Sequence, residues 1–261
     1  RMMDRLAKTL ASYGIWAVLF VTCPPFFVVA LLVWLVTVPF DPRLRALHMY
    51  SCAWASFYTY VFPYWFVSVR NRERLRNDTA YVVVANHQSL LDILVLFRLY
   101  RHFKWVSKAA VFRLPFIGWN MTLNRYIPIR RGDSADAVRM MADCGKALDS
   151  GSSIMIFPEG TRSLDGELRD FRHGAFTLAL RHHVPILPIV LDGTLDALPK
   201  HGIVSPGANI VIQVLDPIPV DGFRDVETLR AHVRRVMADA LIRLRADRRG
   251  ESLPPSAARS A

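Results

Sequence analysis

The chain has 261 residues, enough for one domain of about 150 to 200 residues and a smaller attached segment. It carries 33 Lys and Arg against 22 Asp and Glu, and the net charge of +11 predicts an anionic partner, either nucleic acid or an anionic membrane surface. The three cysteines share no CxxC spacing and are odd in number, which argues against a zinc site or a disulfide framework and favours a reducing compartment.

Two long uncharged runs come first in the chain, at residues 11–40 and 46–69. Each is longer than the roughly 20 residues that cross a hydrocarbon core. The first run is too long for a signal-peptide core and no small-residue cleavage site follows it, so we expect it to remain as an anchor. Basic residues precede the pair and follow it more densely, which predicts a hairpin with both ends in the cytoplasm.

The type of membrane contact stays open at this point. Pro24 and Pro25 interrupt the first run, and aromatic residues at helical spacing crowd the second. Both features suit a hairpin that lies in one leaflet as well as one that spans the bilayer. Two buried core helices are the alternative to a membrane segment.

After residue 76, short β-rich runs alternate with helical patterns. We expect strands in YVVVAN, WVSKA, RYIPIR, SIMIFP, VPILPIVLD and NIVIQVLDPI, and helices in SLLDILVLFRLY, SADAVRMMADCGKALDSG, HGAFTLALRHH and VETLRAHVRRVMADALIRL. This alternation predicts an α/β fold, a mixed sheet flanked by helices and preceded by the N-terminal hydrophobic helical hairpin. The expected domains are a membrane-embedded helical region over 1–70, an α/β domain over 71–249 and a disordered tail over 250–261.

His87 and Asp92 stand five residues apart in NHQSLLD, directly after the first strand of this pattern. One continuous helix would turn the two side chains away from each other, but a bend before the helix can bring the carboxylate to the imidazole. Ligands of open α/β sheets bind at the carboxyl ends of strands. An aspartate that holds one ring nitrogen leaves the other to remove a proton.

No G-x-S-x-G motif supplies a nucleophile, so the histidine is expected to act on a hydroxyl of the substrate. A helix-capping aspartate beside a loop histidine without a chemical role is the alternative. The remaining histidines have no carboxylate at a comparable spacing, and we interpret them as structural or solvated: His48 within the second apolar run, His102, His173, His182, His183, His201 and His232.

A second polar turn, FPEGTRS at residues 157–163, also follows a predicted strand. Gly160, Thr161 and Arg162 offer backbone N–H groups, a hydroxyl and a guanidinium fork, a combination that suits a phosphate. Glu159 cannot bind an anion directly, but it could orient Arg162 or accept a hydrogen bond from a substrate hydroxyl. The alternative is an ordinary polar turn with a glutamate–arginine pair.

NHQSLLD, FPEGTRS and the later VPILPIV together resemble the glycerolipid acyltransferase family, and within it the 1-acyl-sn-glycerol-3-phosphate acyltransferases. The resemblance covers residues 70–220. It implies that His87 is the base and Asp92 its orienting partner. The residues implied for the glycerol-phosphate site are Glu159, Gly160, Thr161 and Arg162, with positive charge from Lys108 and Arg130. Because Arg131 adjoins Arg130, the choice between these two arginines stays open.

The resemblance further implies transfer of a fatty acyl chain from a coenzyme A or acyl carrier protein thioester to the sn-2 hydroxyl of lysophosphatidic acid. The product would be phosphatidic acid, made for phospholipid biosynthesis. No metal or bound cofactor is expected, and the expected partners are membrane phospholipids, the lysolipid and the acyl donor, with no nucleic acid. The expected location is the bacterial inner membrane, with the catalytic domain on the cytoplasmic side.

Three alternatives to this function remain. The acceptor could be another lysophospholipid or an amino-acid-derived lysolipid. Water could replace the lipid hydroxyl, which would make the protein a thioester hydrolase. A basic membrane protein that only binds anionic lipid or nucleic acid would explain the charge, but it would not explain the two polar motifs at strand ends.

Overall fold

The computed structural model describes residues 2–61, 65–130, 132–199, 204–205 and 207–251, with side chains from residue 12 onward. Its described strands form one mixed sheet in the order β1-β7-β6-β2-β5-β3-β4. Strands β6 and β7 are antiparallel, whereas all the other neighbours are parallel. The strands are β1 Trp65–Arg70, β2 Val82–Ala85, β3 Phe103–Lys108, β4 Ile127–Ile129, β5 Ser153–Ile156, β6 Ile186–Asp192 and β7 Ala208–Val214. The predicted fold class is therefore confirmed.

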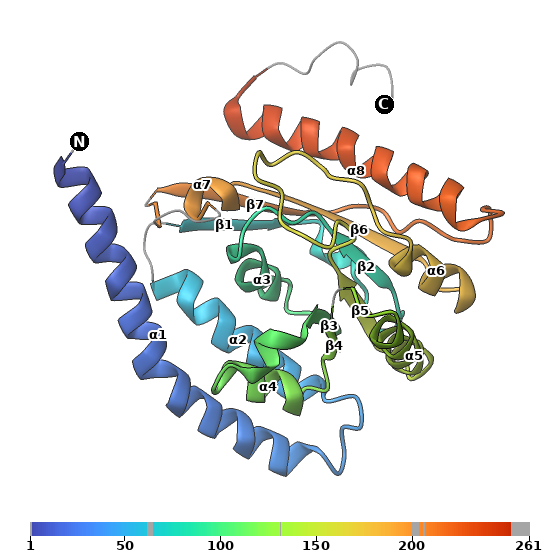
Figure 1. The fold of residues 1–261 in the computed structure, drawn as a ribbon, viewed down its shortest axis with the longest axis horizontal. Helices are drawn as coiled ribbons and strands as arrows, with labels where there is room; N and C mark the ends of the chain where they lie inside the picture. Colours follow the sequence, from blue (N-terminus) through green and yellow to red (C-terminus); the bar gives the residue numbers. More distant parts are fainter. Residues whose placement is uncertain (1, 62–64, 131, 200–203, 206, 252–261) are drawn as a thin grey trace.

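Helices cover both faces of the sheet (Figure 1). The α-helices are α1 Met2–Thr37, α2 Arg45–Val61, α3 Leu91–Leu96, α4 Ile117–Leu123, α5 Ser134–Asp149, α6 Gly174–Arg181, α7 Thr194–Ala197 and α8 Val226–Arg249. Three short 3₁₀ helices, η1 Arg72–Arg74, η2 Phe97–Leu99 and η3 Ala109–Arg113, complete the described helices.

Strand β2 shows how the sequence builds two cores. Its residues are all buried, and alternate side chains of a strand point to opposite faces of the sheet. Val83 and Ala85 pack in a cluster with residues of α2 and α3. Val82 and Val84 pack in a second cluster with residues of α5, α6 and α8. A strand buried on both faces reads as the continuous apolar run VVVA.

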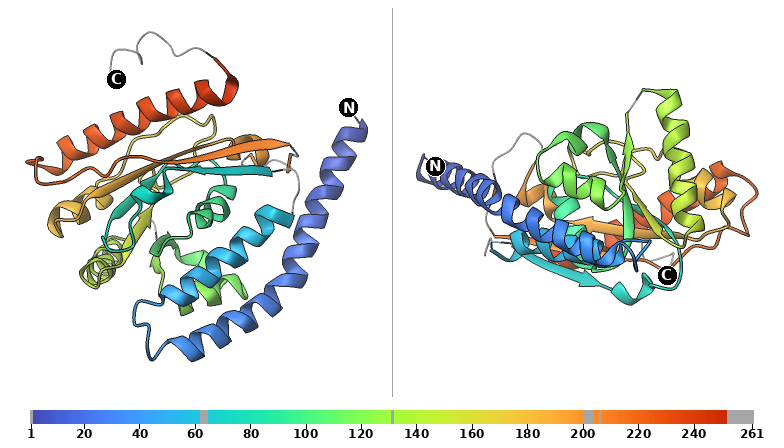
Figure 2. Two further views of the ribbon diagram at one scale, coloured as in Figure 1. Left: turned by 180° about the vertical axis from the view of Figure 1, so that it is seen from behind. Right: turned by 90° about the horizontal axis from the view of Figure 1, so that it is seen from below.

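Helices α1 and α2 form the predicted N-terminal hairpin, with α1 lying along α2 in both views (Figure 2). Residues Ser12–Thr37 of α1 are long and apolar enough to cross a membrane, and only 11% of the most apolar window is buried. Lys104 attaches the hairpin to the sheet, because its ammonium on β3 donates to the main-chain oxygens of Arg43 and Asn124. The hairpin and the α/β unit therefore pack as one body.

The second apolar run divides into two elements. The sequence placed the end of the helical region at residue 70, but α2 ends at Val61 and Trp65–Arg70 forms β1, which pairs with β7 in the sheet. The alternation of more and less buried residues in β1 is the period of two expected for a strand. Helices α4 and α7 were also not expected. The predicted tail lies outside the described residues, except for residues 250 and 251.

The sheet topology decides where the polar motifs meet. Strands β6, β2, β5, β3 and β4 are neighbours in that order and run parallel, so their carboxyl ends lie along one edge. The predicted site residues end or follow β2, β5, β3 and β4. Neighbouring strands lie about 4.8 Å apart, so the order of strands ranks how far each predicted residue is from His87.

Candidate active site

The loop after β2 brings His87 and Asp92 together. His87 lies two residues beyond the strand and Asp92 is in the first turn of α3, with a bend between them. The imidazole Nδ1 is 2.7 Å from Asp92 Oδ2. Because an ionised carboxylate can only accept hydrogen bonds, Nδ1 carries the proton and Nε2 keeps its lone pair. The sequence-based contact is therefore present, in the tautomer that a general base needs.

Asp92 is fully buried and yet well supplied with hydrogen-bond donors. Besides the imidazole, Oδ2 accepts from the main-chain N–H groups of Gln88 at 2.7 Å and Ser89 at 2.8 Å. The other oxygen, Oδ1, accepts from the hydroxyl of Thr194. These donors compensate for the desolvation of the charge. Asp92 thus contacts the His87 ring and two main-chain N–H groups of the loop before α3, whereas Leu90, the N-cap of that helix, has no side-chain cap.

The turn after β5 holds His87 from another direction. Its imidazole stacks on Phe157, with ring centroids 4.0 Å apart and ring planes at 12°. The main-chain N–H of His87 donates to Glu159 Oε1 at 2.8 Å, and its carbonyl accepts from the N–H of Ser163 at 2.8 Å. NHQSLLD and FPEGTRS therefore form one site, in which the side chain of His87 is 11% exposed.

Glu159 acts as a brace between loops. It is 4% exposed, and its second carboxylate oxygen accepts from the N–H of Arg169 at 3.0 Å. Burial raises the pKa of Glu159 to about 7, against the opposing effect of its two main-chain hydrogen bonds. Its hydrogen bonds are thus with main chain, and it does not bond Arg162, one of the two roles considered from the sequence.

The predicted cationic residues lie along the same edge of the sheet. Arg162 follows β5, next to β2; Lys108 ends β3, one strand further; and Arg130 follows β4, the outermost strand. Among the described residues, the side chains of Lys108 and Arg162 form no ion pair with a carboxylate, whereas Arg130 donates its main-chain N–H to Asp136 Oδ2 and lies near that charge. Gly160, in the turn that also carries Thr161, has a φ of +68°, and the guanidinium of Arg172 lies over it, so that a Cβ there would meet Arg172 Nε at 2.5 Å. Arg131 lies outside the described residues.

Other histidines occupy structural positions. His48 is fully buried, with one ring nitrogen 2.7 Å from the hydroxyl of Tyr126 and the other 2.9 Å from the carbonyl of Arg101. His182 has the carboxylate partner that the sequence did not reveal, since its Nδ1 is 2.8 Å from Asp149 Oδ1. That pair joins the C-terminal ends of α6 and α5, away from the FPEGTRS turn. His201 lies outside the described residues.

Two residues that contact the His87–Asp92 pair, Phe157 and Thr194, were not predicted from the sequence. Phe157 is the first residue of the FPEGTRS motif, and Thr194 lies 102 residues from the Asp92 carboxylate to which it donates. The signal that could have found Thr194 is its place after β6, at the carboxyl edge where the motifs meet. Among the described residues, no group of three or more His, Cys, Asp and Glu side chains is placed to hold a metal ion.

Comparisons with known proteins point in one direction. The Acyltransferase family model matches residues 66–192. The chain is 35% identical over 241 residues to a 1-acyl-sn-glycerol-3-phosphate acyltransferase of Chlamydomonas reinhardtii, covering 90% of this chain and 70% of the relative. It is 39% identical over 183 residues to a chloroplastic 1-acyl-sn-glycerol-3-phosphate acyltransferase of Arabidopsis thaliana, covering 69% of this chain and 51% of the relative.

A solved structure resembles the whole described fold. The crystal structure of the 1-acyl-sn-glycerophosphate acyltransferase PlsC from Thermotoga maritima matches with a TM-score of 0.75 and 26% sequence identity, covering 94% of this chain and 97% of that one. The curated relatives from Arabidopsis thaliana and Brassica napus are longer, and the chain spans 51% and 49% of their lengths.

Proposed function

The chain belongs to the 1-acyl-sn-glycerol-3-phosphate acyltransferase family, and from that premise we propose that it transfers a fatty acyl chain from a thioester to the sn-2 hydroxyl of lysophosphatidic acid, forming phosphatidic acid. The observation that carries the proposal is the His87–Asp92 pair. Its Nδ1 is fixed by a buried carboxylate, and its Nε2 has no hydrogen-bond partner among the described residues. A neutral imidazole held in this way is a general base for a hydroxyl.

The reaction proceeds in one covalent exchange between the two substrates. Nε2 of His87 removes the proton of the lysolipid hydroxyl as its oxygen attacks the thioester carbonyl carbon. The tetrahedral intermediate collapses, the carbon–sulfur bond breaks, and the thiolate takes the proton back from the imidazolium. Asp92 stabilises that imidazolium while it exists, and general-base assistance contributes about 10² to 10⁴ in rate.

The phosphate of the acceptor is proposed to bind on the cationic side of His87, toward β5 and β3. Arg162 follows the neighbouring strand, while Lys108 ends a strand about 10 Å from β2 and Arg130 follows one about 14 Å away. Arg162 and Lys108 are therefore better placed than Arg130, and main-chain N–H groups of the turn that carries Gly160 and Thr161 add donors. These groups bind ground and transition states alike, so they act mainly on KM.

The donor and the location are proposed from charge and hydropathy. The net charge of +11 suits a coenzyme A thioester, an acidic acyl carrier protein and an anionic membrane surface alike. The exposed apolar face of α1 supports membrane association, where a lysolipid resides. We place the protein at the bacterial inner membrane, with the α/β domain on the cytoplasmic side where thioester donors are found.

The test is a reconstituted assay with the full chain, lysophosphatidic acid and either acyl-coenzyme A or acyl carrier protein. Free thiol should appear in proportion to phosphatidic acid. Thiol release at a rate that does not depend on the lysolipid would identify a thioester hydrolase instead. A panel of other lysophospholipids and amino-acid-derived lysolipids identifies the acceptor, and lysophosphatidic acid should give the highest kcat/KM. A protein that only binds anionic lipid or nucleic acid would release no thiol.

A further inference from the structure

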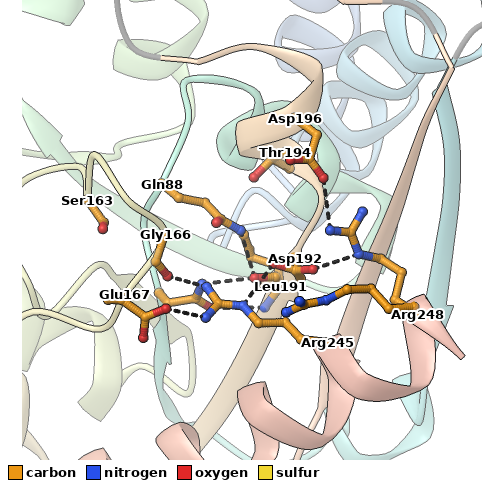
Figure 3. Close-up of polar contacts among 12 residues, drawn as sticks. Gln88, Ser163, Gly166, Glu167, Leu191, Asp192, Thr194, Asp196, Arg245 and Arg248 are labelled. Atoms are coloured by element: carbon orange, nitrogen blue, oxygen red, sulfur yellow. Dashed lines mark hydrogen bonds and ion pairs between the residues drawn. The ribbon is translucent and has the colours of Figure 1, made fainter. Parts of the chain in front are cut away.

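Side chains of the loop after β2 bind the end of β6 and the segment that follows it. The amide of Asn86 donates to the carbonyl of Leu191 and accepts from its N–H, both at 2.9 Å. Gln88 Nε2 donates to the same carbonyl at 2.9 Å (Figure 3). The hydroxyl of Ser89 donates to the carbonyl of Leu198 at 2.6 Å. Residues 86–89 therefore take their position from the segment 191–198.

The segment 191–198 also supplies a side-chain donor to Asp92 in α3. Thr194, the first residue of α7, is fully buried and donates its hydroxyl to Asp92 Oδ1. The three donors described above, including the His87 imidazole, bind Oδ2. Among the described residues, Thr194 is thus the side chain that holds the oxygen which His87 does not use.

The backbone around Thr194 is fixed by close packing. Gly193 has a φ of +93°, and a Cβ at this position would lie 2.1 Å from the carbonyl oxygen of Asn209. A residue other than glycine would have to displace the main chain of β7. The turn therefore presents the Thr194 hydroxyl from one defined backbone position.

Two arginines of α8 secure the same turn (Figure 3). Buried Asp192 forms ion pairs with Arg245 Nε at 3.3 Å and Arg248 Nε at 2.7 Å. Arg248 also pairs with Asp196 in α7 at 2.8 Å. Arg245 continues to the loop after β5, where it pairs with Glu167 at 2.6 Å and donates to the carbonyl of Gly166. The network thus ties α7 and the loop that carries the FPEGTRS turn to one helix.

We propose that Thr194 is a positioning residue for acyl transfer and acts through Asp92. The torsion that orients a carboxylate is broad, so a carboxylate held at one oxygen can still rotate about its Cβ–Cγ bond. The hydrogen bond from the Thr194 hydroxyl prevents this rotation. It keeps Oδ2 of Asp92 on the His87 imidazole while the imidazole gains and loses a proton during turnover. This inference rests on the proposed function of the His87–Asp92 pair as the catalytic base.

The first test compares Thr194→Val, which removes the hydroxyl at nearly constant volume, with Thr194→Ser, which keeps it. We expect Thr194→Val to lower kcat about tenfold with KM changed by less than about twofold, and Thr194→Ser to retain at least about half of kcat. Thr59→Val is the matched control, because Thr59 is also buried and its hydroxyl bonds the carbonyl of Ser56 within α2. It should leave kcat unchanged.

A second test asks whether the effect passes through Asp92. In an Asp92→Ala background the hydroxyl has no carboxylate to hold, so adding Thr194→Val should change the residual kcat by less than about twofold. Additive losses would overturn the proposal, as would full kcat in Thr194→Val or equal losses in the valine and serine variants. If Thr194→Val yields no folded protein by circular dichroism, Thr194→Ala gives the same comparison.

The assay separates this inference from the proposed function. Rates are followed as thiol release with whichever acceptor wild-type protein uses best, and variants are expressed relative to wild type. If the wild-type protein releases thiol with another acceptor but not with lysophosphatidic acid, the proposed acceptor is wrong. The rates of the Thr194 variants relative to wild type still test the role of Thr194. A wild type that releases no thiol overturns both.

Discussion

Among the described residues, two histidine–aspartate pairs lie at hydrogen-bond distance, and their lengths are nearly the same. His87 Nδ1 is 2.7 Å from Asp92, and His182 Nδ1 is 2.8 Å from Asp149. Their carboxylates differ sharply, because the side chain of Asp92 is fully buried and that of Asp149 is 67% exposed. A surface pair of this kind is worth little, since solvent screens it.

The second imidazole nitrogen separates the pairs further. A Cβ on Gly145 would lie 2.7 Å from His182 Nε2, so that nitrogen is pressed against the backbone of α5 and the ring fills the space between α5 and α6. His87 Nε2 has no partner in the described residues, and its loop lies at the carboxyl edge of the parallel strands. A short histidine–aspartate distance is thus not evidence for a base, whereas a desolvated carboxylate and a free nitrogen are.

The largest expected effect tests this comparison directly. His87→Ala removes the base and should lower kcat by about 10² to 10⁴, whereas His182→Ala should change kcat by less than about twofold. Initial rates of thiol release with lysophosphatidic acid, and circular dichroism as a check on folding, provide the measurement. Similar losses in both variants would mean that the two pairs are not functionally distinct.

Substitution of the two aspartates should also affect kcat unequally, but by a smaller factor than substitution of the two histidines. In Asp92→Asn the amide oxygen can keep the three donors on Oδ2 while the amide nitrogen donates to the Thr194 hydroxyl, so mainly the charge is lost. A hydrogen bond to a charged group is worth about 1.5 to 3 kcal/mol, or about ten- to hundredfold in kcat. Asp149→Asn should have no effect. Wild-type kcat in Asp92→Asn would leave Asp92 with only a structural role, as the acceptor for N–H groups of the loop before α3.

Glu159, which braces the His87 loop and has no counterpart beside His182, should make stability depend on pH. Because burial raises its pKa from 4.5 to about 7, the folded protein keeps a proton in this pH range that the unfolded chain has lost. The free energy of unfolding should therefore fall as pH rises through this range, by about 3 kcal/mol relative to Glu159→Gln. Denaturant titrations of both proteins between these pH values measure the difference, and a constant difference would contradict the prediction.

The smallest expected effect concerns KM. Arg162→Lys keeps the charge but loses the planar fork. We therefore expect kcat/KM for lysophosphatidic acid to fall about 5- to 30-fold, which corresponds to a loss of about 1 to 2 kcal/mol of binding free energy, chiefly through a higher KM. Use of a neutral monoacylglycerol should suffer less. Arg181→Lys, beside His182 on the exposed end of α6, is the control and should change neither substrate. An unchanged KM would mean that the phosphate is held elsewhere, with Lys108 the next candidate.

The sequence predicted most of the sheet because apolar period and turn residues are local signals. It failed for β1, because the aromatic residues of Trp65–Arg70 continue the apolar run of α2. The local signal that separates the two is Pro63 in the sequence, a residue type that ends helices, and the prediction did not use it. Within the site, the His87–Asp92 contact was predictable because five residues and one bend determine it. The role of Glu159 was not, because it depends on main-chain donors from the His87 loop and from Arg169, ten residues further along its own loop.

Contacts between distant segments account for what else was missed. The hydroxyl of Thr194 meets Asp92 across 102 residues, and His182 meets Asp149 across 33. No sequence motif marks Thr194 or His182 as a partner of these carboxylates. The first contact follows from the order of the strands, and the second from the packing of two helices. Periodicity can therefore identify the elements of this fold, but only the assembled sheet shows which histidine is held by a buried carboxylate.

The pairing of β1 has a consequence for how the chain is made. β1 pairs in the sheet with β7, with Trp65 opposite Ala208. The first of the described strands to be synthesised therefore has no partner until the last of them is made. At a synthesis rate of about 5 to 20 residues per second, the ribosome needs about 7 to 30 seconds to supply the partner. Helices α1 and α2 have already been synthesised when that interval begins. The hydrophobic hairpin of the nascent chain is therefore complete before β1 can pair with β7, and a chaperone or a membrane can cover it in the meantime.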